Sequence, residues 1–112
     1  MEIKKASEIP GRPVDISEWN DDVKAFVKTF TFAEQLEFER LRRIFRDETA
    51  PNEKRVAAAV RATIMSLVDE NGEQLLNEGD IPALLDGPAF MIDRVVLAAA
   101  NADWVDVSFK KK

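Results

Sequence analysis

The chain has 112 residues, of which 46% are hydrophobic and 33% charged, enough for one domain to bury a core without covalent staples. Its net charge of −5 argues against nucleic-acid binding, because phosphate recognition needs a basic excess on one face. Cysteine and histidine are absent, which removes disulfides, thiolate nucleophiles and the commonest metal ligand and general base near neutral pH. We therefore expect no enzyme, no metal site and no cofactor.

The N-terminal segment MEIKKASEIPGRP lacks the apolar core of a signal peptide. No run of the sequence reaches the ~20 apolar residues that a membrane span requires. We therefore expect a cytoplasmic protein with no membrane partner. Pro10, Gly11 and Pro13 predict that residues 1–13 are an extended lead-in, and residues 14–108 are expected to form a single globular domain.

Residues 14–31 are expected to form a β-hairpin with its turn after Trp19, where three polar residues follow one another. In the second half of this segment Val23, Ala25 and Val27 share one side. This alternation is the period of a strand with one buried face.

Two long helices are expected next, over about residues 32–47 and 53–68. Thr31 and Glu34 have the spacing of a capping box at the start of the first helix, and Asn52 can cap the second. The helical period predicts a core face on each helix. These faces consist of Phe38, Leu41, Ile44 and Phe45 in the first helix and of Val56, Val60, Ile64 and Leu67 in the second.

The acidic stretch that begins at Asp69 is expected to be a turn, with Gly72 at a positive φ. A calcium loop would need glycine at its sixth position and glutamate at its twelfth, whereas this stretch has glycine at its fourth and Asp80 at its twelfth. Asp80 is expected to cap a short helix over about residues 80–86, which tolerates Pro82 in its first turn.

The last helix is expected over about residues 88–104 and is apolar on nearly every side, so more than one of its faces must be covered. Phe90, Leu97 and Trp104 recur every seven residues along it. They either cover the hairpin of the same molecule or form a surface for another subunit or a client. Met65 points away from the core stripe of its own helix and is the fourth candidate interaction residue. Together the elements predict an α+β, mainly α fold, in which the N-terminal β-hairpin is followed by three longer helices and one short helix.

A second hypothesis concerns the first long helix. Its four arginines could bind RNA or DNA, which would make the chain a small regulatory nucleic-acid-binding protein. Glutamates on the same helix partly cancel their field, so a solvated, salt-bridged face is the preferred interpretation. The arginines are Arg40, Arg42, Arg43 and Arg46, and the glutamates are Glu34, Glu37 and Glu39.

From residue 14 to residue 103 the chain resembles the small tail assembly chaperones of long-tailed (siphophage-type) bacteriophages. The most specific part is Leu67-Val68-Asp69-Glu70-Asn71-Gly72, where a helix ends in an apolar pair before an acidic turn with a glycine. In that family a short helix and a closing apolar helix follow, as they are expected to here. Leu75-Leu76-Asn77 departs from the aromatic-then-acidic pattern of the family, and Gly87-Pro88 is a sharper break.

The resemblance implies a non-enzymatic factor of virion morphogenesis in the cytoplasm of a host bacterium. Such chaperones bind the tape measure protein, keep it soluble and help recruit subunits of the major tail tube protein, and they are absent from the mature virion. It also implies a homo-oligomer and a longer form of the chain made by a translational frameshift. The basic segment 109–112, Phe-Lys-Lys-Lys, is compatible with such a frameshift, and a solubilising lysine tail is the other interpretation.

Overall fold

The computed structural model describes the backbone of residues 1–110 and the side chains of residues 1–101. Four α-helices and a small three-stranded sheet form the fold, so the expected α+β, mainly α class is confirmed. In chain order the elements are η1 (Ala6–Glu8), β1 (Arg12–Val14), β2 (Ala25–Val27), α1 (Phe32–Arg46), α2 (Asn52–Ser66), β3 (Leu67–Val68), η2 (Glu78–Asp80), α3 (Ile81–Asp86) and α4 (Ala89–Lys110).

The sheet is antiparallel, in the order β1-β2-β3, and β2 is its central strand. The expected hairpin is present, but its strands are shorter than the sequence indicated and a long loop joins them. Ala25 and Val27 face the core, as the alternation predicted, and are 4% and 2% exposed. On its other edge β2 pairs with Leu67 and Val68.

The strand β3 corrects the prediction that the second long helix continues to residue 68. The helix α2 ends at Ser66. The backbone N–H of Lys28, the residue directly after β2, donates to the carbonyl of Ser66 at 2.9 Å. Leu67 is then extended and 1% exposed. A two-residue apolar run fits a buried strand as well as a helix end, and the free edge of β2 decides between them.

The helix α1 begins where the sequence predicted. The Thr31 hydroxyl accepts from the backbone N–H of Glu34 at 3.1 Å, and the Glu34 carboxylate accepts from the backbone N–H of Thr31 at 2.9 Å, which completes the capping box. Phe38 and Leu41 are buried as expected. The ring of Phe30 lies 5.2 Å from that of Phe38 and extends this core toward the sheet.

The core face of α2 differs from the prediction. Val56 is 45% exposed, and the buried face is formed mainly by small residues: Ala58, Ala59, Ala62, Thr63 and Ser66. The hydroxyls of Thr63 and Ser66 donate to backbone carbonyls one turn earlier in the same helix, so their hydrogen bonds need no partner from another element. Val60 is buried as predicted, at 3% exposed. The small side chains let α1 and α4 approach the backbone of α2 closely, so the core face is centred on them and Val56 stays at the surface.

The capping prediction for Asn52 is wrong, and the one for Asp80 holds in position only. Asn52 is the first residue of α2 and makes no capping hydrogen bond, because Pro51 is the residue at the N-cap position. Asp80 occupies the N-cap position of α3, but its carboxylate accepts from the backbone N–H of Asn77 at 2.9 Å and makes no capping hydrogen bond to α3. The turn after β3 is as expected: Gly72 has a φ of 82°, and Asp69 accepts from two backbone N–H groups of the same turn.

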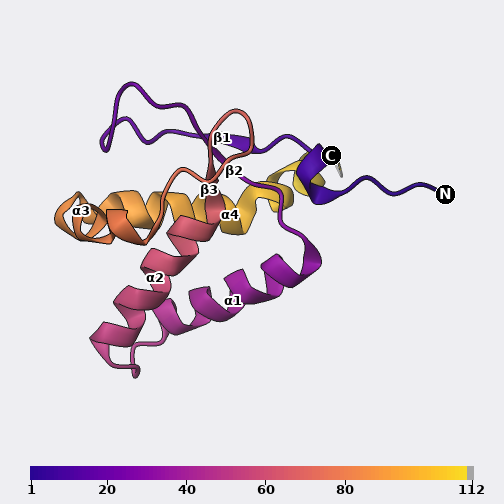
Figure 1. The fold of residues 1–112 in the computed structure, drawn as a ribbon. Coiled ribbons are helices and arrows are strands. Elements are labelled where there is room, and N and C mark those ends of the chain that lie inside the picture. Colours follow the sequence, from indigo (N-terminus) through magenta and orange to yellow (C-terminus); the bar gives the residue numbers. More distant parts are fainter. Residues whose placement is uncertain (111–112) are drawn as a thin grey trace.

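The helix α4 crosses the molecule and packs on α2 and on the sheet (Figure 1). Its buried residues are Met91, Val95, Val96 and Ala99. The helix extends to Lys110, past the expected end at residue 104, and includes the first two residues of the segment expected as a basic tail. Within the described residues, none of the helices combines the length and the apolar character needed to cross a bilayer.

Candidate protein-interaction site

The helices α1 and α4 share a core but leave an open groove between them. Figure 1 shows the two helices as separate rods, with α2 crossing from one to the other. Two hollows lie between α1 and α4, one of about 760 Å³ at the start of α1 and one of about 500 Å³ near its end. Arg42 lines both. We call this feature the α1–α4 groove. Its walls are Gln35, Glu39, Arg42 and Arg46 on α1 and Asp93, Val96, Leu97 and Ala100 on α4.

Both walls follow from helical spacing. The α1 residues are separated by four, three and four positions, and the α4 residues fall within two turns, so each set occupies one face of its helix. The wall from α1 is polar and the wall from α4 is mainly apolar. A groove of this kind can hold an amphipathic helix, with its apolar side toward α4.

Apolar side chains form the floor and rim of the α1–α4 groove. Val96 and Ala99 are buried in the floor, and Phe45 is partly buried at the narrower end. Leu97 is 54% exposed at the rim, and Phe32 at the wider end is 80% exposed. These exposed side chains are apolar surface that the fold of one molecule does not cover.

The charged groups of the groove are partly used within the fold. Arg42 lies 3.8 Å from the Glu39 carboxylate, and Glu39 also accepts from the side-chain amide of Gln35 at 3.1 Å. Arg55 donates to the backbone carbonyl of Phe45 at 3.0 Å. Arg46 is exposed and forms no ion pair with any residue whose side chain the structure describes. The groove therefore offers a free cation beside apolar surface.

The structure places three of the four residues that the sequence proposed for interaction, and they lie in different surroundings. Leu97 lies in the α1–α4 groove. Phe90 is 51% exposed but is stacked under the guanidinium of Arg94, which lies 5.5 Å from its ring centre. Met65 is partly buried and packs against the core that contains Phe38 and Val96. Trp104 lies outside the residues whose side chains are described.

Arg94 fixes the N-terminal half of α4 to the loop after β1. Its guanidinium donates to the Glu18 carboxylate at 2.8 Å and to the backbone carbonyl of Asp15 at 3.0 Å. The hydrogen bond from Arg94 holds the pKa of Glu18 below its usual value of 4.5, and the same bond raises the pKa of Arg94. The stripe through Phe90 and Arg94 therefore holds α4 to the rest of the fold, whereas the side chain of Leu97, one turn later, stays half exposed.

Sequence analysis missed the aromatic residue at the wider end of the groove. Phe32 is the first residue of α1 and lies off the buried face that contains Phe38 and Leu41. A large apolar residue directly after an N-cap and outside the core period was the available signal. Leu36, one turn later, is also exposed, at 57%.

Two of the four arginines of α1 are paired within their own helix. Arg40 donates two hydrogen bonds to Glu37, at 2.8 and 2.9 Å, and Arg42 pairs with Glu39. These pairs form the solvated, salt-bridged face that the sequence favoured. No cluster of acidic side chains suited to a metal ion occurs in the part of the chain whose side chains are described.

Comparisons with models of protein families, with curated proteins and with solved structures find no match to this chain.

Proposed function

We propose that this protein is a non-enzymatic assembly chaperone of a bacteriophage tail, which covers apolar stretches of a long helical client, the tape measure protein. One observation carries the proposal: an open groove between two helices, with an apolar floor and with Leu97 54% exposed at its rim. The order of elements from the hairpin to the closing apolar helix supports the choice of this family.

The groove suits a helix. Its α1 wall runs from Gln35 to Arg46, which is about 16 Å at ~1.5 Å per residue. A client helix of about three turns would fit along this length. Each Å² of apolar surface that the client and Leu97 remove from water contributes about 25 cal/mol.

Weak individual contacts are sufficient for this task. Several chaperone molecules along one extended client would add avidity without any single contact being tight. Tail tube subunits and a frameshifted longer form of the chain are further proposed partners, and the host cytoplasm is the proposed place of action. Binding of nucleic acid through α1 is the weaker proposal, because glutamates of the same helix pair with Arg40 and Arg42 and the net charge of the chain is −5.

Co-expression of the chain with the tape measure protein expected to be encoded nearby tests the proposal. Leu97→Asp should leave the chaperone folded, because the side chain is half exposed, and should move most of the client from the soluble to the insoluble fraction. Ile9→Asp is the control, since Ile9 is also a half-exposed apolar side chain, at 45%, but lines neither hollow of the α1–α4 groove. If both variants, or neither, lose the soluble client, the groove is not the client site.

A further inference from the structure

A second apolar surface lies on α2 and α3, and the α1–α4 groove shares no residue with it. The two helices enclose a hollow of about 470 Å³ whose lining is almost entirely apolar. Val56 and Leu85 stand at its rim and are 45% and 54% exposed. We call this feature the α2–α3 face. Its apolar residues are Val56, Ala57, Val60, Ile81 and Leu85.

Two opposite charges flank this face symmetrically. Glu53 and Arg61 each lie four residues from Ala57, on the same ridge of α2. They are about 12 Å apart along the helix, at ~1.5 Å per residue, so they cannot pair with each other in one molecule. Neither forms an ion pair or a side-chain hydrogen bond with a residue whose side chain the structure describes.

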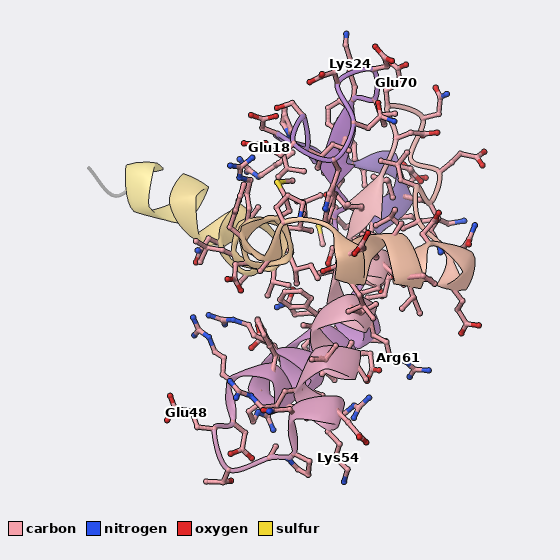
Figure 2. The ribbon with its side chains drawn as sticks, turned by 90° about the vertical axis from the view of Figure 1, so that its left-hand side faces the viewer. Glu18, Lys24, Glu48, Lys54, Arg61 and Glu70 are labelled. Atoms are coloured by element: carbon pink, nitrogen blue, oxygen red, sulfur yellow. The ribbon has the colours of Figure 1, made fainter. Side chains whose placement is uncertain are left out.

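Figure 2 shows that Arg61 extends from α2 away from the body of the molecule. The pKa of Glu37 on α1 is lowered mainly by the hydrogen bond from Arg40, and the charge of Arg61 lowers it least. Arg61 is therefore available to a carboxylate from outside the molecule.

We propose that the α2–α3 face binds a second copy of this chain, with the two α2 helices antiparallel and a two-fold axis at Ala57. In an antiparallel pair centred on residue 57, Glu53 of each copy faces Arg61 of the other. One self-complementary surface thus forms both ion pairs, as a two-fold interface requires. This charge pattern favours a second copy over other apolar partners, because the acidic end of the face on one copy complements the basic end on the other.

The side chains around the axis suit close contact. Ala57 is exposed and small, so the two helices can approach each other along the ridge that it occupies. Val56 and Leu85, on either side of the hollow, become covered by the same residues of the second copy. Apolar burial drives the association, and the two ion pairs set its orientation and register. Because no residue is shared, the pairing leaves the α1–α4 groove of each copy open.

Charge-swap variants test this pairing by analytical ultracentrifugation of the protein alone. Glu53→Arg places two arginines together at each end of the interface, and Arg61→Glu places two glutamates together, so each should raise the dimer dissociation constant about tenfold or more. The double variant, and an equimolar mixture of the two single variants, should restore the dimer. Recovery in the mixture also shows that both single variants are folded.

Lys24→Glu and Glu70→Arg are the control variants, because they change charge in the same way at the end of the molecule opposite Arg61 (Figure 2). Both should dimerise as the unaltered chain does. A chain that is monomeric at every concentration overturns the proposal. A dimer that the single swaps do not weaken, or that the double swap does not restore, overturns it as well, because the copies then meet through another surface.

Discussion

Gly11 leaves no room for a side chain where the chain enters the first strand. A Cβ at this position would lie 2.6 Å from the backbone carbonyl oxygen of Val27 and 3.1 Å from Cβ of Phe26. The first contact is with backbone, which cannot move aside as a flexible side chain would. We expect Gly11→Ala to lower the free energy of unfolding by about 1–3 kcal/mol, the usual cost of overpacking. Urea denaturation measures this loss, and an unchanged midpoint would show that β1 and β2 are not this close.

The ion pair between Glu18 and Arg94 makes stability depend on pH. The pKa of Glu18 is lowered in the folded chain, mainly by the hydrogen bond from Arg94, so this group stabilises the fold above its usual pKa of 4.5. That contribution is lost as the pH falls through the lowered value. We expect Glu18→Gln to be less stable than the unaltered chain at neutral pH, and the difference to shrink as the pH falls below 4.5. Denaturation of both proteins across this range measures the difference. A gap of constant size would contradict the assignment.

The surroundings of the proposed interaction residues could be predicted from the sequence only in part. The seven-residue spacing of Phe90 and Leu97 correctly placed both on an incompletely buried stripe of α4. It could not show that Arg94 ties this stripe to the rest of the fold, because the hydrogen-bond acceptors of Arg94 come from a loop 76 or more residues earlier. Nor could it show that Met65 reaches the core, since that depends on how closely α4 approaches α2.

At the scale of elements, the small residues of α2 determine how the helices pack. Ala62 has no exposed surface and lies in the core with Phe38 and Leu41 of α1 and Val96 of α4. A larger side chain there would push the helices apart. We expect Ala62→Leu to lower the free energy of unfolding by about 1–3 kcal/mol. Ala33→Leu, at an exposed position of α1, is the control and should change stability little. Equal effects in thermal denaturation would show that α2 is not closely packed.

Elements with a local cause could be predicted from the sequence. The capping box at Thr31 and the turn at Gly72 depend on residues within four positions of each other, and both are present. The strand β3 and the exposure of Val56 depend on distant partners, namely the free edge of β2 and the close approach of α1 and α4. Hydrophobic period alone ranked Val56 above the alanines because it measures side-chain size and takes no account of the distance between helices.

At the scale of the whole molecule, the fold presents two apolar surfaces with different characters. The α1–α4 groove is amphipathic and carries Arg46, which has no ion pair among the described side chains, whereas the α2–α3 face is apolar and flanked by complementary charges. The first is suited to an extended helical client and the second to a copy of the same chain. Because they share no residue, dimer formation and client binding can be altered separately.

The central claim is that the client lies in the α1–α4 groove, and site-specific crosslinking tests it most directly. The chain has no cysteine, so Leu97→Cys introduces a single attachment point for a benzophenone photo-crosslinker. Lys24→Cys, at the other end of the molecule from the helical hairpin of α1 and α2, carries the same label as a control (Figure 2). The proposed function predicts a crosslink to the tape measure protein from residue 97 and none from residue 24. A soluble complex with no crosslink from residue 97, or with equal crosslinks from both positions, would contradict it.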